Sequence, residues 1–281
     1  MQIYLDCLPC NLRQVLEASR MTGCDEATKK EIALEAVNVL HEYDKYRTAP
    51  EIARAMQKIV NDKTGVYDAY KEIKKADIET AKKLKPKLQE LISKKEDKLY
   101  WSIKAAAVGN VLDSAVVQQT KIEDSLVAEF EKDFAISDYD KFKEKIKDAK
   151  NILIIGDNCG ETVFDTILME NLPKEAVITY ATRNIPVIND VTIQEAKDSG
   201  IEEYAKIISS GSNYPGTVLE GCSEEFLELF KNADVVISKG QGNFETMSES
   251  GREIFYVLKA KCPVVAKLLD VPVASYIFKL I

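Results

Sequence analysis

Residues 151–165, NILIIGDNCGETVFD, decide the fold, because a short apolar run ends at Gly156 and polar side chains follow at once. Further short apolar runs come after residue 150, and helical stretches separate them: AVITYAT, AKIISSG, DVVISKG and PVVAKLLD. Strands that alternate with helices are typical of a mostly parallel sheet with helices on its faces. The second half of the chain is therefore predicted to be a three-layer α/β domain.

The first half of the chain has a different period. From Leu12 to about Lys147 the apolar residues recur three and four positions apart, which predicts helices. One such stripe consists of Ile32, Ala33, Ala36, Val37 and Leu40. The change of period near residue 150 predicts two domains, a helical domain over 1–149 and an α/β domain over 150–281.

Composition narrows the classes of function. The chain has 281 residues, 46% of them hydrophobic, and a formal net charge of -8, which repels polyanions and argues against a nucleic-acid partner. No segment approaches the roughly 18 to 20 apolar residues that cross a bilayer, and no secretory signal is visible, so we expect a cytoplasmic protein without a membrane partner. The single histidine, His41, cannot supply a multi-histidine zinc site.

The loop after the first strand carries the clearest chemical signal. Asp157 and Asn158 place oxygens just past the strand end, and Glu161 opens the next helix. In open α/β sheets, ligands bind outside the carboxyl ends of the strands. The glycine spacing does not match a dinucleotide-binding turn, whereas carboxylate and carboxamide oxygens suit a hard divalent cation. This loop therefore predicts a metal site.

Two later loops are expected at the same sheet edge. TRNIPVINDVT, residues 182–192, contains Arg183, Asn184 and Asp190, and its aspartate is read either as a helix cap or as a metal ligand. SKGQGNFET, residues 238–246, sets Lys239 beside two glycines, a pattern that suits an oxyanion or phosphate. Acidic metal ligands beside a cationic phosphate clamp indicate phosphoryl chemistry.

The helical half offers one comparable element, AAAVGNVLDSAV, residues 105–116. Asn110 and Asp113 lie three positions apart and share a face if the segment is helical. One interpretation is an ordinary helix packed closely on a neighbour, with Asn110 as a cap. The other is that Asn110 and Asp113 reach across a cleft to hold substrate.

Four ordered motifs resemble those of the metal-dependent damage-control phosphatases, the family once labelled domain of unknown function eighty-nine. They are GNVLD, GDNCGE, RNIPVINDVT and KGQGNFE, and the opening CLPC resembles the archaeal-type branch with an N-terminal C-x-x-C. The resemblance covers essentially the whole chain. It implies a helical domain packed on a Rossmann-like α/β domain, with the site between them.

The resemblance also implies roles for single residues. By motif position, the divalent metal falls on Asp157, Asn158 and Asp190, and Lys239 is implied to contact phosphate. Substrate or phosphate contacts are expected from Asn110, Asp113, Arg183 and Asn184, with Glu161 as a further candidate.

The resulting hypothesis is a phosphatase that hydrolyses sugar phosphates or damaged phosphometabolites with manganese, cobalt, nickel or magnesium. Asp157 and Lys239 are the catalytic candidates, and whether Asp157 also attacks phosphorus is left open. The rival hypotheses are a nucleotide- or S-adenosylmethionine-dependent transferase and a non-catalytic module that binds a phosphometabolite or a metal. The sequence does not give the oligomeric state.

The cysteines form a separate candidate site. Cys7 and Cys10 have the spacing of a zinc knuckle or a redox pair, and Cys222 is a candidate third ligand. Zinc is the metal expected there. The alternative is two buried thiols near a helix start, with Cys24, Cys159 and Cys262 as packing residues.

Overall fold

The computed structural model describes residues 1–109 and 119–281, so Asn110 and Asp113 lie outside the described residues. The helices are α1 (Cys7–Met21), α2 (Glu26–His41), α3 (Ala49–Thr64), α4 (Lys71–Ser93), α5 (Lys98–Val108), α6 (Gln119–Phe130), α7 (Tyr139–Lys147), α8 (Cys159–Glu170), α9 (Ile193–Asp198), α10 (Glu224–Asn232), α11 (Gln241–Met247) and α12 (Pro263–Leu268). The strands are β1 (Phe134–Ser137), β2 (Asn151–Ile155), β3 (Val177–Thr182), β4 (Lys206–Ser209), β5 (Val235–Lys239), β6 (Phe255–Lys259) and β7 (Tyr276–Leu280).

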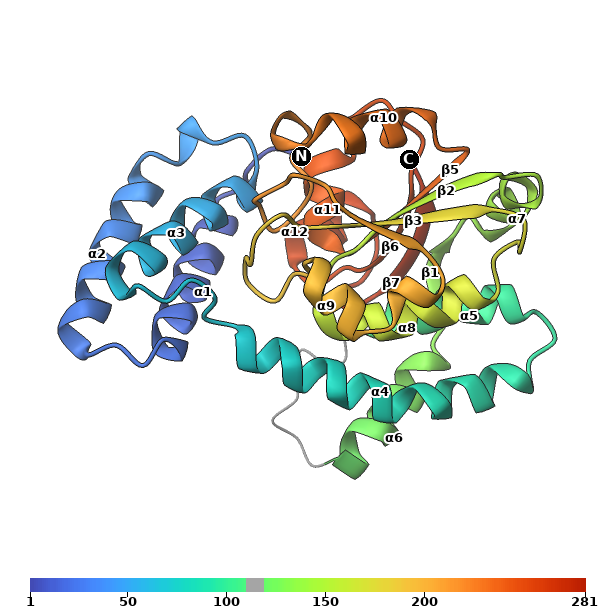
Figure 1. The fold of residues 1–281 in the computed structure, drawn as a ribbon. Helices are drawn as coiled ribbons and strands as arrows, with labels where there is room; N and C mark the ends of the chain where they lie inside the picture. Colours follow the sequence, from blue (N-terminus) through green and yellow to red (C-terminus); the bar gives the residue numbers. More distant parts are fainter. Residues whose placement is uncertain (110–118) are drawn as a thin grey trace.

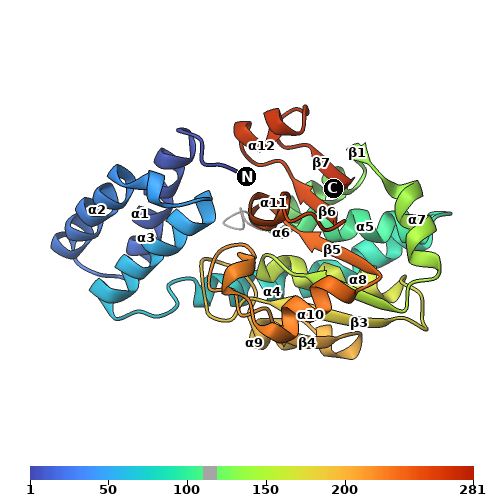
Figure 2. The same ribbon diagram turned by 90° about the horizontal axis from the view of Figure 1, so that it is seen from above.

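Helices α1, α2 and α3 pack on one another as a small bundle at one end of the molecule (Figures 1 and 2). Ile32 and Ala36 of the predicted stripe are fully buried in the bundle's own apolar core, whereas Val37 is 49% exposed. Asp25 caps α2 by accepting from the Thr28 N–H, and Gly65 ends α3 in the left-handed conformation that glycine adopts readily. The bundle therefore has its own local folding signals.

The sheet has seven strands in the order β1-β7-β6-β5-β2-β3-β4. All neighbouring strands are parallel except β6 and β7. Successive residues of β2 enter two different cores, Ile152 and Ile154 on one face and Leu153 and Ile155 on the other. The predicted α/β class with a helical N-terminal region and a mostly parallel sheet is confirmed.

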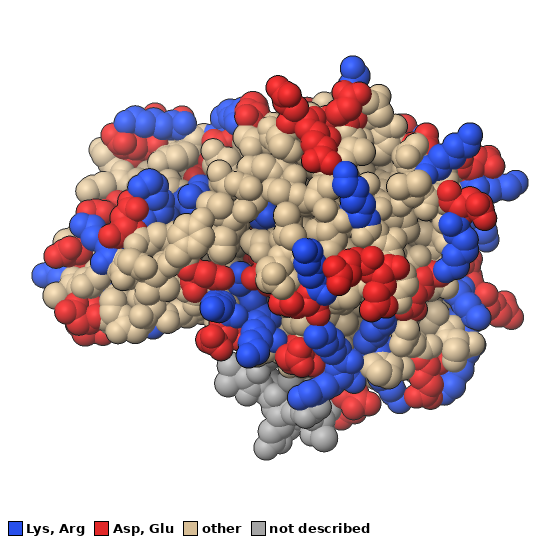
Figure 3. Space-filling model, viewed as in Figure 1, with Lys and Arg blue, Asp and Glu red and all other residues tan. Residues whose placement is uncertain are grey.

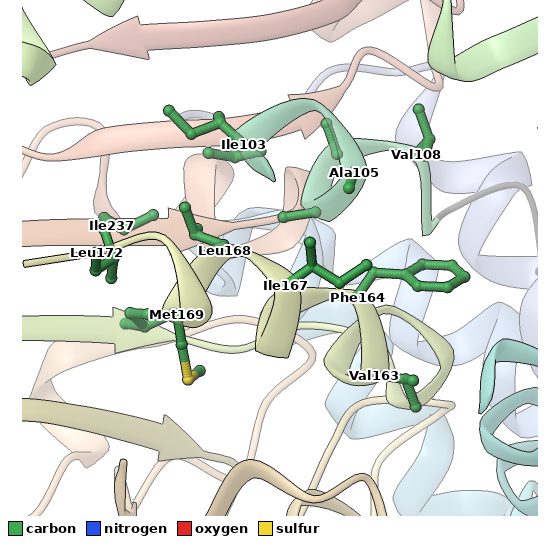
Figure 4. Packing of buried hydrophobic residues seen from close by; sticks show 14 of the residues in the cluster. Ile103, Ala105, Val108, Val163, Phe164, Ile167, Leu168, Met169, Leu172 and Ile237 are labelled. Atoms are coloured by element: carbon green, nitrogen blue, oxygen red, sulfur yellow. The ribbon is translucent and has the colours of Figure 1, made fainter. Parts of the chain in front are cut away.

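Helices α4 and α5 lie against α8 over one face of the sheet, and α5 also contacts β6 and β7 directly. Figure 4 shows Ile103 and Ala105 of α5 above Phe164, Ile167 and Leu168 of α8. On the opposite face, α10, α11 and α12 contribute to the second core. This layering holds the start of α8, and with it the loop that follows β2.

Two strand assignments differ from the sequence pattern. β1 lies in the stretch read as helical and before the predicted boundary at residue 150, yet it pairs with β7. PVVAKLLD forms α12 instead of a strand, because Pro263 takes the first helical turn, where its missing N–H costs nothing. The strands at this side of the sheet are β6, β7 and, at the edge, β1. The division at residue 150 stays a prediction.

Charged side chains of both signs are interspersed over the face shown in Figure 3. Many belong to exposed helix pairs one turn apart, such as Lys58 with Asp62 and Lys94 with Glu90. Such pairs add little stability but keep the helix faces soluble. Along the described ranges, no helix combines the length and apolar character needed to cross a membrane.

Candidate active site

A cavity of about 670 Å³ lies between the helical bundle and the carboxyl ends of the strands. The bundle contributes residues of α1 and the start of α3, while the α/β part contributes the loops after β2, β3, β5 and β6. The polar side chains that line it include Cys7, Cys10, Arg13, Asp157, Asn158, Asp190, Gln241, Glu245, Lys261 and Cys262.

Backbone hydrogen bonds lock the loops after β2 and β3 together. The Val191 N–H donates to the Asp157 carbonyl at 2.8 Å, and the Cys159 N–H donates to the Asn189 carbonyl at 3.0 Å. Asn158 and Asp190 form an isolated antiparallel bridge. The two loops lie roughly 30 residues apart in the sequence. They meet at one edge of the sheet because neighbouring parallel strands have their carboxyl ends at the same edge.

Asp190 is not the cap of the following helix. Thr192 is the N-cap of α9 and forms a capping box with Glu195, whose carboxylate accepts from the Thr192 N–H at 3.0 Å. Lys74 of α4 pairs with that glutamate at 2.6 Å and so anchors the loop from the other side. The cap interpretation of Asp190 is therefore wrong, and its carboxylate lines the cavity instead.

Arg183 lies behind the two aspartates. Its Nε donates to Asp190 Oδ2 at 2.7 Å, and its Nη2 lies 3.6 Å from Asp157 Oδ1. The remaining guanidinium donors bind Thr217 Oγ1 at 2.9 Å and Asn243 Oδ1 at 3.0 Å, and the residue is 1% exposed. In this position Arg183 holds both carboxylates in place, and its predicted contact with substrate stays a prediction.

Asp157 occupies a site that favours a bound cation. Burial raises the pKa of its carboxyl well above the usual value, Asp190 and Glu161 raise it further, and Arg183 acts in the opposite direction. A Cβ on Gly240 would stand 1.9 Å from Asp157 Oδ2, so only glycine leaves room for this carboxylate. A divalent cation would relieve the repulsion between the two aspartates.

Asn158 completes an oxygen donor set. Its Nδ2 donates to Glu161 Oε1 at 2.9 Å, which turns the carbonyl oxygen Oδ1 the other way. Two carboxylates and one carboxamide oxygen fit a hard divalent cation. Within residues 1–109 and 119–281 no three His, Cys, Asp or Glu side chains are placed to hold a metal ion, so the fit rests on the asparagine as third ligand.

Lys239 is fully buried beneath this site. Its Nζ donates to the Ala106 carbonyl at 2.8 Å, to Asp165 Oδ1 at 2.6 Å and to Glu161 Oε2 at 3.2 Å. Burial lowers the pKa of the ammonium, but Asp165 and Glu161 outweigh it and the pKa is raised. Lys239 therefore stays charged and orders Glu161, which in turn orients Asn158. Its predicted phosphate contact is not tested by this arrangement.

The start of α8 and the end of α5 approach each other closely. A Cβ on Gly109 would stand 2.8 Å from the Glu161 Cα, so the close packing expected from the small residues of AAAVG is present. The predicted phosphate ligands Asn110 and Asp113 follow directly, outside the described residues.

Asn184 lies away from the cavity. It is exposed, its Nδ2 donates to Asn213 Oδ1 at 3.1 Å, and its Oδ1 accepts from Ser209 Oγ at 3.2 Å. These contacts join the loops after β3 and β4. Its predicted role in substrate binding stays a prediction that these contacts do not support.

The cysteines are distributed differently from the predicted set. Cys7, Cys10 and Cys262 line the cavity, whereas the Cys222 thiol donates to the Val218 carbonyl at 3.4 Å. Cys159 is buried behind the metal loop, where its thiol donates to the Asp190 carbonyl at 3.5 Å. The zinc hypothesis is therefore left as a prediction for Cys7 and Cys10, without Cys222 beside them.

Two charged cavity residues, Arg13 and Lys261, carried no sequence signal. Arg13 of α1 and Lys261 after β6 bring positive charge to the cavity, and Gln241 and Glu245 of α11 form its wall. Arg13 lies on α1, roughly 100 residues or more before the strands in the sequence. Only tertiary packing places it in the cavity. Gln241 and Glu245 belong to the KGQGNFE motif, so the sequence already places them after a strand of the sheet.

Comparisons with known proteins agree with this architecture. The model of the damage-control phosphatase ARMT1-like domain matches residues 3–277. The damage-control phosphatase PH1575 of Pyrococcus horikoshii is 35% identical over 279 residues, which cover 97% of this chain and 96% of that protein. A damage-control phosphatase of Archaeoglobus fulgidus is 26% identical over the full length of both chains.

The same likeness holds in three dimensions. The crystal structure of the family protein PH1575 superposes with a TM-score of 0.91 at 32% identity, covering 99% of this chain and 98% of that one. The expectation of a branch marked by an N-terminal C-x-x-C stays a prediction.

Proposed function

Because the chain belongs to the damage-control phosphatase ARMT1-like domain family and is a phosphatase, we propose that it hydrolyses small phosphomonoesters with a divalent metal held by Asp157, Asn158 and Asp190. The substrates would be sugar phosphates or damaged phosphometabolites, with water as acceptor. The observation that carries this proposal is the convergence of three side-chain oxygens from two interlocked loops on one cavity. A cytoplasmic location is part of the same proposal.

The protein's own residues would position the reacting groups. When bound, the metal would supply positive charge that neutralises the phosphoryl oxygens and lowers the pKa of water. Manganese, cobalt, nickel and magnesium all accept such an oxygen-rich donor set. Arg183 fixes Asp157 and Asp190, and Lys239 fixes Glu161 and through it Asn158. We assign both cations this positioning role, and a direct phosphate contact by Lys239 stays part of the prediction.

The cavity lining supports a polar substrate. None of the described residues that line it is aromatic, so it offers no surface on which a nucleobase could stack. Arg13 and Lys261 supply positive charge, and Asn11, Gln14 and Gln241 supply amide groups that suit hydroxyls. This lining favours a sugar phosphate over a nucleotide and speaks against the nucleotide-dependent transferase.

The test is phosphate release from a panel of sugar and nucleotide monophosphates, using chelator-treated protein with each divalent metal added back. We expect metal-restored release that disappears in Asp157→Ala and Asp190→Ala. The matched control is Asp62→Ala, which removes an exposed carboxylate on α3 that pairs only with Lys58 among the described residues. No release with any metal, together with tight phosphosugar binding, would contradict the proposal and favour the non-catalytic binding module.

A further inference from the structure

Glu245 is the last residue of the KGQGNFE motif, and its side chain belongs neither to the proposed metal ligands nor to the groups that hold them. It lies on α11, is 8% exposed, and lines the cavity that also contains Asp157 and Asp190. Gly240, the N-cap of α11, touches Asp157, and Glu245 follows five residues later. At a rise of 1.5 Å per residue, this separation is about 7 to 8 Å along the helix. Glu245 thus lies in the same cavity as Asp157, farther along α11 than the residue that touches Asp157.

The orientation of the Glu245 carboxyl is fixed by Gln241. Gln241 Oε1 accepts from the Lys261 N–H at 3.0 Å, which identifies the other side-chain atom as the amide nitrogen. That nitrogen, Nε2, donates to Glu245 Oε1 at 2.7 Å and to the Cys262 thiol at 3.3 Å. Glu245 is thus held by a neutral donor against the cavity wall.

Glu245 differs from the other buried carboxyls of the site in its lack of a cationic side-chain partner. Asp157 and Asp190 contact Arg183, and Glu161 contacts Lys239. In the described part of the chain no lysine or arginine forms an ion pair with Glu245. Because burial disfavours the charged carboxylate and no cationic side chain offsets this, Glu245 retains its proton readily.

The titration of Glu245 agrees with this environment. Burial raises its pKa to about 7, while the Gln241 hydrogen bond and the Met1 ammonium act in the opposite direction. Among the described residues, the charged and titratable groups that act on it are the Met1 ammonium, which itself pairs with Glu249 at 3.3 Å, and the Cys7 thiol of α1. A substantial fraction of molecules therefore carries the Glu245 proton at neutral pH.

We propose that Glu245 is the general acid that protonates the leaving-group oxygen of the phosphomonoester; this inference rests on the proposed phosphatase function. Water forms the new O–P bond as the bond between phosphorus and the ester oxygen breaks. The carboxyl proton of Glu245 passes to the departing oxygen, giving a neutral alcohol. The attacking water keeps one hydrogen on the phosphate and releases its other proton to solvent, and solvent returns a proton to the Glu245 carboxylate. The net reaction consumes one water and yields alcohol and inorganic phosphate.

The need for such an acid follows from the substrate class. The alkoxide of a sugar is a poor leaving group, and a positioned proton donor accelerates its departure by roughly 10²- to 10⁴-fold. A nitrophenolate leaves without a proton and gains little from the acid. Comparing the two leaving groups therefore distinguishes two roles for Glu245: a general acid affects only the alkyl ester, whereas a residue that shapes the cavity affects both esters.

The test compares Glu245→Gln with the wild type on an alkyl phosphomonoester, such as a hexose phosphate, and on 4-nitrophenyl phosphate. We expect kcat to fall about 100-fold or more on the alkyl ester and less than about 3-fold on the aryl ester. The matched control is Glu253→Gln, which removes a carboxylate that is 59% exposed, pairs with Lys145 and lies outside this cavity. It should leave both rates unchanged.

An equal loss on both esters would overturn the general-acid role. If the wild type hydrolyses both esters, the proposed phosphatase function still holds after such a result. If the wild type hydrolyses neither ester, the proposed function itself is wrong. A second readout needs no turnover: in protein labelled with ¹³C at glutamate carboxyls, one resonance should titrate with a midpoint near pH 7 and disappear in Glu245→Gln. The absence of any such glutamate from the wild type would also overturn the role, even if the variant did not fold.

Discussion

Replacing Lys239 with methionine is expected to destabilise the whole protein, because it leaves buried carboxylates without a countercharge. Lys239 and Asp165 are both 0% exposed and Glu161 is 1% exposed, so water cannot take over the lost interactions. The Ala106 carbonyl also loses the Lys239 ammonium as a donor. Among the described residues, Asp165 retains only the hydrogen bond from the Tyr180 hydroxyl at 2.8 Å.

The expected cost is about 3–5 kcal/mol in the free energy of unfolding, the usual result of breaking a buried ion pair by removing one partner. Since single-domain stabilities are about 5–15 kcal/mol, the variant should unfold at a clearly lower urea concentration. The assay is urea unfolding followed by circular dichroism. Lys58→Met, which breaks the exposed pair with Asp62, is the control and should cost less than about 1 kcal/mol.

A double variant sharpens the result. Adding Asp165→Asn to Lys239→Met removes one of the stranded charges, so the two changes should be clearly less than additive. A loss below about 1 kcal/mol for Lys239→Met, at an unchanged slope of free energy against urea, would refute the reasoning that this ion cluster is dry and paired.

Two further changes test other parts of the molecule. Gly240→Ala would place a Cβ 1.9 Å from Asp157 Oδ2 and should weaken manganese binding at least about 10-fold by calorimetry. Gly251→Ala has the same positive φ with nothing within 4 Å, so it carries the backbone strain alone and should leave the affinity unchanged. Lys104 is buried against Phe134 and Tyr276, and this burial is the main cause that lowers the pKa of its ammonium from 10.5 to about 8. The charge of Lys104 therefore destabilises the folded state most below pH 8. This penalty in the free energy of unfolding fades as the pH rises toward 10.5. Lys104→Met should therefore be more stable than the wild type by roughly 1–3 kcal/mol at pH 7, and a difference that does not shrink by pH 10 would refute this.

The sequence was sufficient where a pattern was long and local. NILIIG, AVITYAT and DVVISKG form strands as predicted, because each is a run of several apolar residues followed directly by a polar loop. It failed where a segment was short: FAIS gives too few residues to show a period of two, and PVVAKLLD is apolar in a way that fits strand and helix equally. Only the proline at the first turn distinguishes the second case.

For the candidate site, the order of the motifs in the sequence located the proposed metal-binding oxygens but not the side chains that surround them. Asp157, Asn158 and Asp190 meet because strand ends meet, which the sequence implies. The burial of Lys239 and Arg183 depends on side chains from α5, α8 and the loop after β4, and such contacts have no local signature. The α1 wall with Arg13 is likewise a product of how the bundle packs against the sheet edge.

The most direct test of the metal site is calorimetric titration of manganese into chelator-treated wild-type protein and the Asp190→Asn variant. We expect one site per chain in the wild type and an affinity at least about 100-fold lower in the variant, with Cys7→Ser as a control that binds like the wild type. Equal binding by wild type and Asp190→Asn, or binding lost only in Cys7→Ser, would contradict the assignment of the metal to the loops after β2 and β3.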